Sequence, residues 1–366
     1  MSKKDMYYHI EEDLEAYPDA VFYFIIGGRA TGKTYSTLKW CVENNKKFVF
    51  IKRLAKDVDT MCGSNRPNRK IIFEADNSPM KPINRDLGTN FQACKVSNGL
   101  GGFYEIDEQG FAIRQIGYIV SLAEVATIRG FDMSDADIII YDEFIPQVGE
   151  RGIASAGDAF LNVVRTVLRD RPERGLKTTV ICLANANSLD NPVMETMDKV
   201  TELAIMDRDG IEYQYDKERK ILIHRIADHP EWKSAVEQSD FYQAVKGTTW
   251  AGMAYDNTFA YDDVSDIEMH VNTREWTPIW RVKYKDYKWI AWVNEKDQRM
   301  VVSRTDTNKD IHTYDFNVNA SLNLWYRSED YTVLTNLWDK GRVKFSDYVA
   351  RNRLIYTGKW FTNDLR

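Results

Sequence analysis

A glycine-rich stretch near the N-terminus constrains the fold of this chain more than any other segment. Residues 27–36 read GGRATGKTYS and directly follow the apolar run VFYFII at 21–26. The order of a glycine, four residues and then Gly-Lys-Thr is the full GxxxxGK[ST] spacing, in which glycines allow backbone N–H groups to surround phosphate oxygens. A following helix adds positive potential at its N-terminus. We therefore predict a buried strand, a phosphate-binding loop (P-loop) and a helix over 32–45.

The residue types in this loop predict how a nucleotide is held. We expect the Lys33 ammonium to reach the β- and γ-phosphate oxygens and the Thr34 hydroxyl to bind Mg²⁺. The expected cofactors are therefore ATP and Mg²⁺. The predicted nucleotide-binding residues of the loop are Gly27, Gly28, Arg29, Ala30, Thr31, Gly32, Lys33 and Thr34.

Two consecutive carboxylates end a second apolar run, ADIIIYDEF at 136–144. Asp142, at the end of a buried strand, is expected to hold Mg²⁺ through water. Glu143 is expected to polarise the attacking water as general base. Because phosphoryl transfer to a metabolite needs no activated water, the pair predicts an ATPase. The alternative interpretation is an acidic cap at the end of a strand.

Strand-like and helix-like segments alternate up to residue 196. Apolar runs predict strands at 47–53 and 178–188, and amphipathic spacing predicts a helix at 158–172 with Asp158 as its N-cap and Pro172 at its end. Such alternation predicts an α/β domain with a mostly parallel sheet. The 47–53 strand lies between the P-loop strand and the acidic strand, and an inserted strand is typical of additional-strand ring ATPases.

Two smaller features belong to the same domain. FYEIDEQGFAIR at 103–114 predicts a β-hairpin with DEQG as its turn. Asn185, near the end of the 178–188 strand, is placed to contact the γ-phosphate or the attacking water. The alternative for Asn185 is that its side chain only turns the chain.

The composition excludes several classes of protein. No run of about 18 apolar residues occurs, so we expect no membrane-spanning segment. The N-terminus lacks the apolar core of a signal peptide, which argues against secretion. The four cysteines form no CxxC pair, which argues against a zinc ribbon or a disulfide scaffold and favours a reducing cytoplasm; they are Cys41, Cys62, Cys94 and Cys182.

The net charge of −6 argues at first sight against a nucleic-acid partner. Contacts to phosphates need only a local basic surface, however. Residues 339–366 hold seven Lys and Arg against three acidic residues. This segment is either a solvated basic tail or a binding surface.

The sequence pattern changes after Pro192. Residues 197–264 are charge-rich, with short strand candidates at 213–226, and we assign them to a connector subdomain. Residues 277–305 predict three alternating strands joined by the turns KD and EKDQ. Eight of the ten tryptophans lie at or beyond residue 250, and on strands we expect them to pack in a core, with base stacking as the alternative. The predicted domains are an ATPase domain at 1–196, a connector at 197–264 and a C-terminal domain at 265–366.

Five of these stretches together resemble the genome-packaging (encapsidation) ATPases of small phi29-like podophages, which are additional-strand P-loop ring ATPases related to large terminases. A weaker resemblance continues from KGTTWAGMAYDNTF at 246–259 to the end, so it covers nearly the whole chain. The five stretches, in the family's order and near its spacing, are FIIGGRATGKTYS, KFVFIKRLAK, IIIYDEFIP, LNVVRTVLRDRPER and VICLANANSLDNP.

The resemblance implies a motor that hydrolyses ATP to drive double-stranded viral DNA through the portal into an empty procapsid. It implies a homomeric ring, typically a pentamer, at the portal vertex, often seated on a packaging RNA. It also implies that the protein works in the cytoplasm of the host bacterium, binds the procapsid transiently and is absent from the mature virion.

The resemblance further implies roles for three arginines in catalysis. Arg29 matches an arginine that senses or steers the γ-phosphate of its own subunit. Arg169 matches an arginine finger that reaches into the ATP site of the neighbouring subunit, although Arg165 and Arg171 lie close enough in sequence to be alternatives. Arg129 matches a basic residue that also acts across the subunit boundary and is coupled to the glutamate.

One basic residue is implied to contact DNA instead. Lys56, just after the 47–53 strand, matches a lysine implicated in gripping DNA in the pore of the ring. For Lys56 and for the arginines, ordinary surface or loop charges are the alternative.

The C-terminal domain resembles the α+β ribonuclease-H-like nuclease of large terminases. A two-metal nuclease needs carboxylates on its first strand, and PIWRVKY at 278–284 has none. Asp286, Glu295 and Asp297 fall in turns. We therefore expect a vestigial domain without nuclease activity that binds nucleic acid or the portal. Two other functions stay open: a terminase large subunit with an active C-terminal nuclease, and a non-motor P-loop ATPase switch.

Overall fold

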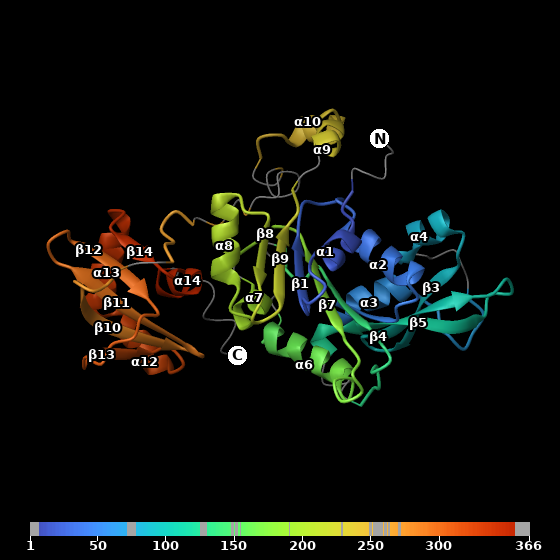
Figure 1. Cartoon of the computed structure of the whole chain (residues 1–366), viewed down its shortest axis with the longest axis horizontal. Coiled ribbons are helices and arrows are strands. Elements are labelled where there is room, and N and C mark those ends of the chain that lie inside the picture. The colour runs from blue at the N-terminus through green and yellow to red at the C-terminus, as the bar shows by residue number, and fades with distance from the viewer. Residues whose placement is uncertain are drawn as a thin grey trace. The chain divides into compact units, whose positions relative to one another are not determined.

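A computed structural model defines the fold in two compact units. The first unit comprises residues 1–197 and 210–262, and the second comprises 198–209 and 263–366. Figure 1 labels the helices and strands of both. The structure describes residues 7–355 apart from 72–77, 125–129, 148–149, 151–152, 154, 190, 228–229, 249–250, 252–258, 260–261, 263 and 270–271.

The first unit is built on a nine-stranded, mostly parallel sheet, as the alternation of segments predicts. Its strand order is β3-β4-β5-β2-β6-β7-β1-β9-β8. Strands β5, β2, β6, β7, β1 and β9 pair in parallel, whereas β3–β4–β5 and β8–β9 are antiparallel. The strands are β1 (Phe22–Ile26), β2 (Phe48–Lys52), β3 (Phe91–Ser97), β4 (Leu100–Ile106), β5 (Ala112–Ser121), β6 (Ile138–Asp142), β7 (Thr179–Ala184), β8 (Tyr213–Asp216) and β9 (Ile221–Arg225).

The strand inserted between the P-loop strand and the acidic strand is β7, not the predicted 47–53 strand. Strand β7 pairs with β1 on one side and with β6 on the other. Strand β2, which covers 47–53, lies on the outer side of β6. The order of the strands along the chain therefore did not predict their order in the sheet, because helical crossovers allow a later strand to lie between two earlier ones.

The predicted connector at 197–264 is not a separate unit. Strand β9 pairs in parallel with the whole of β1, from Phe22 opposite Ile221 to Ile26 opposite Arg225. Its apolar residues are buried, so this part of the segment extends the ATPase sheet. The helix α8 (Val200–Asp209) instead belongs to the second unit. The charged flanks of both elements obscured this division in the sequence.

Helices cover both faces of the sheet. Alternate strand residues such as Ile25, Phe50 and Ile140 pack with one group of helices in a single core cluster. On the opposite face, Phe160 of α6 (Ala156–Leu168) contacts the rings of Tyr141 and Phe22. The helices of the first group are α1 (Ile10–Ala16), α2 (Lys33–Glu43), α3 (Ala55–Cys62) and α4 (Met80–Leu87).

Helix α6 differs from the prediction at both ends. Its N-cap is Ser155, which has left-handed φ and no side-chain cap bond, so the predicted Asp158 cap is wrong and Asp158 lies in the first turn. The helix ends at Leu168, before Pro172, because Arg169 adopts a φ of 32°. The first unit also contains α7 (Pro192–Thr196), α9 (Pro230–Glu237) and α10 (Asp240–Val245).

The second unit is an α+β domain around a five-stranded sheet of order β13-β10-β11-β12-β14. Trp280, Trp289 and Trp325 are fully buried, which confirms core packing for these tryptophans. Its strands are β10 (Thr277–Tyr284), β11 (Tyr287–Asn294), β12 (Arg299–Ser303), β13 (His312–Asp315) and β14 (Val343–Phe345), and its helices besides α8 are α12 (Asn319–Tyr326), α13 (Glu329–Asp339) and α14 (Tyr348–Ile355).

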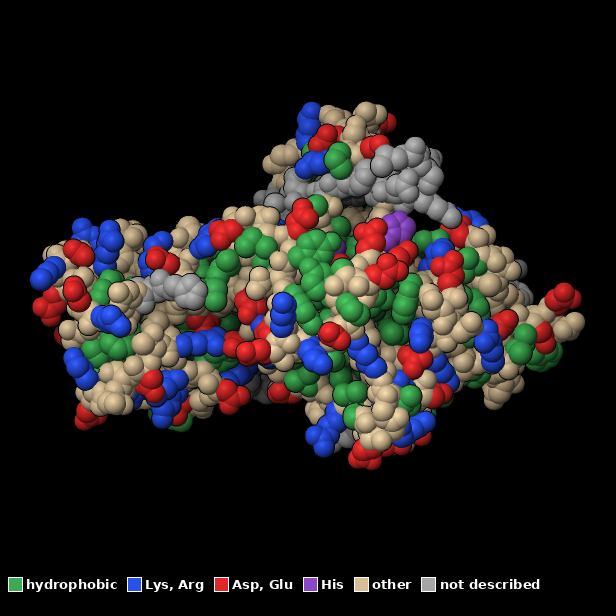
Figure 2. Space-filling model, in the orientation of Figure 1, with side chains coloured by type: hydrophobic (Ala, Val, Ile, Leu, Met, Phe, Trp, Pro, Cys, Tyr) green, Lys and Arg blue, Asp and Glu red, His purple; other side chains and the backbone are tan. Residues whose placement is uncertain are grey.

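The surface carries charges of both signs. On the face shown in Figure 2, Lys and Arg side chains are interspersed with Asp and Glu side chains rather than gathered by sign. Within the described residues, no helix has the length and apolarity needed to cross a membrane.

Candidate nucleotide site

The predicted P-loop lies between β1 and α2, at the carboxyl end of the parallel strands. Gly32 adopts a φ of 89° at the N-terminus of α2, a conformation that favours glycine. A Cβ there would also lie 3.2 Å from the Cβ of Tyr7, so a side chain would be both strained and crowded. Ala30 has a φ of 58°, which bends the loop backbone further. The local fold therefore confirms the strand, loop and helix that the glycine pattern predicts.

Lys33 points into this loop. Its ammonium donates to the carbonyl oxygens of Gly27 (3.0 Å) and Gly28 (2.7 Å), and to Thr31 Oγ1 and Asn185 Oδ1 at 3.2 Å each. Lys33 is buried, with 7% of its surface exposed. Asn185, at the end of β7, therefore lies at the P-loop although 152 residues separate it from Lys33.

Thr34 and Asp142 meet across the carboxyl ends of β1 and β6. The Thr34 hydroxyl donates to Asp142 Oδ1 at 2.8 Å. A hydroxyl beside a strand-end carboxylate, next to a phosphate-binding loop, is a set of hard oxygen donors that suits Mg²⁺. These residues therefore fit the predicted metal.

Glu143 is held by a lysine that the sequence did not single out. Lys52, the last residue of β2, places its ammonium 3.0 Å from Asp142 Oδ2 and 2.9 Å from Glu143 Oε2. Burial favours a lower pKa for Lys52, but the charges of Asp142 and Glu143 outweigh it and raise the pKa above its ordinary value. Burial likewise favours a higher pKa for Glu143, but Lys52, with smaller contributions from Arg29 and Arg53, lowers it. Glu143 also has a left-handed φ of 56°, an uncommon backbone conformation that fixes where its carboxylate lies.

The ion pair predicts how a Lys52→Met substitution changes the pH dependence of ATP hydrolysis. A general base acts in its deprotonated form, so the rate falls as pH drops through its pKa. Removing the nearby positive charge raises the pKa of Glu143, and the acidic limb of the pH–rate profile moves to higher pH by about one pH unit or more. Lys47→Met is the matched control, since Lys47 lies at the other end of the same strand segment and pairs with Asp135. An acidic limb that does not move in Lys52→Met would contradict this coupling.

These groups line one pocket of about 350 Å³, a size suited to a nucleotide. Its walls include the predicted loop residues from 29 to 34 with Asp142, Glu143 and Asn185, and also Tyr35, Leu183 and Ala184. The sequence prediction missed Tyr35 and Lys52. Tyr35 could have been found because it directly follows Thr34, whereas Lys52 depends on the pairing of β2 with β6, which no local pattern encodes.

The arginines separate into distinct environments. Arg29 lines the nucleotide pocket, where its charge acts on Glu143. Arg169 instead follows α6 and donates to the carbonyl oxygen of Phe131 at 2.5 Å, in the segment that precedes β6. Phe131 precedes the amino end of β6, whereas Asp142 lies at its carboxyl end. The length of β6, at about 3.3 Å per residue, therefore separates Arg169 from Asp142. Arg169 therefore cannot reach the pocket of its own subunit.

The alternatives to Arg169 also differ from one another. Arg171 is 2% exposed and holds four hydrogen bonds, so it has no freedom to act as a finger. Arg165 is exposed on α6, one turn before Arg169. Arg129 lies outside the described residues. Lys56 is exposed on the first turn of α3, outside the nucleotide pocket.

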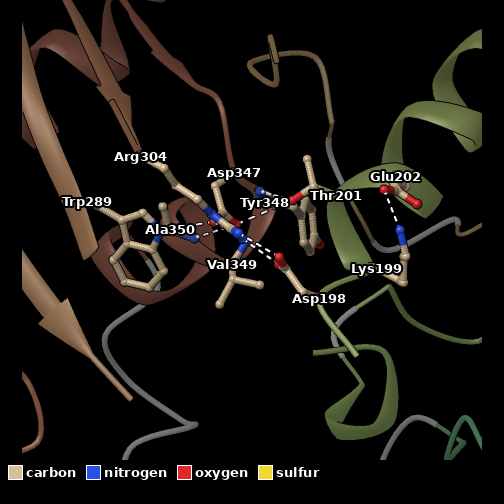
Figure 3. A network of polar contacts seen from close by, with 10 residues as sticks. All are labelled: Asp198, Lys199, Thr201, Glu202, Trp289, Arg304, Asp347, Tyr348, Val349 and Ala350. Carbon is tan, nitrogen blue, oxygen red and sulfur yellow. Dashed lines mark hydrogen bonds and ion pairs between the residues drawn. The ribbon is translucent and has the colours of Figure 1, made fainter. Parts of the chain in front are cut away.

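Among the described residues of the second unit there is no comparable cluster of free carboxylates. Asp286, Glu295 and Asp297 are exposed in the turns around β11, as predicted. The buried Asp347 accepts from Arg304 Nε (2.6 Å) and Trp289 Nε1 (3.0 Å). Figure 3 shows this network, in which Arg304 also forms two bonds to Asp198, beside α8.

Other cations of the second unit are used internally too. Asp266 pairs with the buried Arg351 at 3.3 Å, and Arg353 is also buried, so two cations of the basic 339–366 segment do not face solvent. Over the described residues, no group of three His, Cys, Asp or Glu could hold a metal ion.

The whole chain resembles known DNA packaging proteins in its fold. Solved structures that resemble nearly the whole chain include two packaging motors, while no curated protein sequence matches it. One is the bacteriophage Phi-29 viral genome packaging motor assembly, with a TM-score of 0.59 and 17% identity over 99% of this chain and 100% of that one. The other is the Phi-28 gp11 DNA packaging motor, with a TM-score of 0.55 and 15% identity over 97% of this chain and 99% of that one.

The strand, loop and helix and the pocket beside them have the arrangement expected of a P-loop protein with an inserted strand. The sequence pattern of podovirus DNA encapsidation proteins (Gp16) matches residues 100–358, and the chain therefore belongs to that family. It is a viral DNA packaging protein, which confirms the resemblance inferred from the sequence.

Proposed function

We propose that this chain is the ATP-hydrolysing subunit of a motor that moves double-stranded viral DNA through a portal into a procapsid. The observation that carries the proposal is the convergence of Lys33, Thr34, Asp142, Glu143 and Asn185 on one pocket in a member of a DNA-packaging family. The proposed cofactors are ATP and Mg²⁺. The proposed place of work is the cytoplasm of the host bacterium, at the portal vertex, without incorporation into the mature virion.

The site residues support hydrolysis in a simple division of tasks. Lys33 neutralises the β- and γ-phosphate oxygens, and Thr34 with Asp142 would hold Mg²⁺, which would supply further neutralisation of phosphate charge. Glu143 accepts a proton from the attacking water, and the Asn185 amide orients that water or the γ-phosphate. Arg29, within the loop, adds a further positive charge from the same subunit.

Arg169 requires a second subunit for any role in catalysis. Because Arg169 lies at the amino ends of the parallel strands and its own pocket lies at their carboxyl ends, it can act only on the ATP of another copy. Such a contact joins two different surfaces of identical subunits and is therefore heterologous. Heterologous contacts form a ring when the rotation between neighbouring subunits closes. The resemblance gives five as the expected number of subunits, with Arg129 as a second residue acting across the boundary and a packaging RNA beneath the ring.

Lys56 is the proposed contact to DNA within this ring. It is exposed on the first turn of α3, four positions after Lys52, which touches both catalytic carboxylates. A lysine contact to phosphate would weaken with salt and carry no sequence preference. Substituting Lys56 with alanine should therefore reduce DNA-dependent translocation more at low salt than at high salt, and equal loss at all salt concentrations would argue against a phosphate contact.

We also infer that the second unit is a vestigial ribonuclease-H-like domain without nuclease activity. The buried Asp347 and the half-buried Asp266 are neutralised by arginines, which leaves them unavailable to a pair of metal ions. We expect the full chain to leave linear DNA intact in Mn²⁺. Cleavage that is lost when Asp286, Glu295 and Asp297 are replaced by alanine would favour an active terminase nuclease instead.

Electron microscopy of procapsids with this protein, ATP and DNA tests the proposed assembly. A ring of protein at the portal vertex is the expected result. Protein that hydrolyses ATP but forms no ring at the portal would favour the non-motor ATPase switch.

A further inference from the structure

The loop that carries Arg169 is anchored by a second arginine that the catalytic argument has not used. Arg171 is 2% exposed, yet it carries a full positive charge. Its Nε donates to Thr178 Oγ1 at 2.8 Å, and its Nη1 donates to the Ser134 carbonyl at 2.7 Å. Its Nη2 donates to Asp137 Oδ1 at 2.8 Å and to the Lys177 carbonyl at 2.9 Å. A buried guanidinium with this many partners is satisfied and immobile.

These partners belong to two segments that come together at the amino ends of the central strands. Ser134 and Asp137 precede β6, while Lys177 and Thr178 precede β7. The backbone of Arg171 closes the loop as well, because its N–H donates to Leu168 at the end of α6 (2.7 Å) and its carbonyl accepts from the N–H of Leu176 (2.9 Å). One guanidinium therefore joins the end of α6 to the starts of two central strands.

The same segments hold Arg169. The Arg169 guanidinium donates to the carbonyl of Phe131, in the segment that continues to Ser134 and Asp137. Its left-handed φ of 32° turns the chain between the end of α6 and the anchored Arg171. The direction in which Arg169 leaves the surface is thus set on one side by the Phe131 carbonyl, three residues before Ser134, and on the other by the backbone turn next to the anchored Arg171.

A residue that acts on a neighbour's γ-phosphate must be placed accurately before the subunits meet, since a displacement of about 1 Å can cost about 10²-fold in rate. Only arginine can make the four bonds seen here, because its planar fork presents donors in several directions at once. Lysine at the same position would keep the charge but not the geometry.

We infer that Arg171 is the positioning residue for Arg169, and so sets the activity of the ATP site in the neighbouring subunit rather than in its own. This inference rests on the proposed function, in which Arg169 is the arginine finger. Arg171 would thus affect catalysis although it is buried and contacts no nucleotide.

The test uses the full-length protein assembled on procapsids with DNA and ATP. For Arg171→Lys we expect turnover to fall about 10- to 100-fold with the Kd for ATP little changed, and the temperature of unfolding to fall because buried hydrogen bonds are lost. Thr178→Val, which removes one of the four bonds, should show the same pattern with a smaller loss. Arg174→Lys is the matched control, because Arg174 lies in the same loop, is exposed and pairs only loosely with Asp170 at 3.8 Å.

Mixed motors distinguish positioning from a general loss of structure. Arg171→Lys and Glu143→Gln subunits alone are each expected to keep at most about a tenth of the wild-type turnover. Mixed in equal amounts, they should recover about one quarter of the activity, because half of the subunits keep Glu143 and half of their neighbours supply an intact finger. Arg171→Lys subunits that merely misfold would not be rescued in this way.

The outcomes separate the inference from the proposed function. If Arg169→Ala is inactive and Arg171→Lys is fully active, the positioning role is wrong and the finger stands. If Arg171→Lys is inactive and is not rescued by Glu143→Gln subunits, the residue serves its own site and the inference is overturned. If Arg169→Ala retains full activity, the proposed finger itself is wrong.

Discussion

Replacing Arg169 with alanine is expected to lower the turnover of the assembled motor about 10³-fold or more, the range seen when an arginine finger is removed from a phosphoryl-transfer site. The finger neutralises charge that develops on the transferred phosphoryl group, so its loss affects the chemical step and not the binding of ATP. The Kd of each subunit for ATP should therefore stay the same. Steady-state hydrolysis on procapsids with DNA, together with equilibrium ATP binding, measures both quantities.

Arg165→Ala is the control for this effect. Arg165 is exposed on α6, four residues before Arg169, and is an alternative finger on sequence grounds. We expect it to leave turnover nearly unchanged. If Arg165→Ala stops hydrolysis and Arg169→Ala does not, the finger has been assigned to the wrong arginine.

Replacing Glu143 with glutamine is expected to reduce ATP hydrolysis about 10²- to 10⁴-fold, the contribution of a positioned general base. Glutamine preserves the size of the side chain but cannot accept the proton of the attacking water. The ion pair between Lys52 and residue 143 is lost, but the contacts of Lys33 with the P-loop carbonyls remain. ATP should therefore bind and persist unhydrolysed, which single-turnover measurements would detect.

A comparison with Asp142→Asn sharpens this prediction. Asp142 accepts from the Thr34 hydroxyl and belongs to the proposed Mg²⁺ site, so its substitution should weaken the affinity for ATP in the presence of Mg²⁺. Glu143→Gln should not. Equal losses of affinity in the two variants would show that the carboxylates share one role.

Local patterns in the sequence predicted most of the nucleotide site. The P-loop, Asp142, Glu143 and Asn185 each follow a buried strand, and parallel strands bring their carboxyl ends to one edge of a sheet. The resemblance to packaging ATPases added Arg29 and Arg169, whose positions in the structure fit a cis and a trans role respectively.

What the sequence could not predict depends on which strands are neighbours. Lys52 contacts Glu143 only because β2 lies beside β6, and β7 rather than β2 is the inserted strand. The connector was misassigned because β9 is a short apolar run between charged flanks, recognisable only once it pairs with β1. The buried role of Arg171 was equally hidden, since an Arg in a polar loop looks like surface charge until its four partners come together.

The central claim is that ATP hydrolysis at this site drives DNA into a procapsid, and protection of DNA from DNase tests it most directly. Procapsids, viral DNA and ATP are incubated with the wild-type protein or with Glu143→Gln, and the DNA that survives DNase is measured. We predict full-length protected DNA with the wild-type protein and none with Glu143→Gln. Protection by Glu143→Gln, or hydrolysis by the wild-type protein that protects no DNA, would contradict the account.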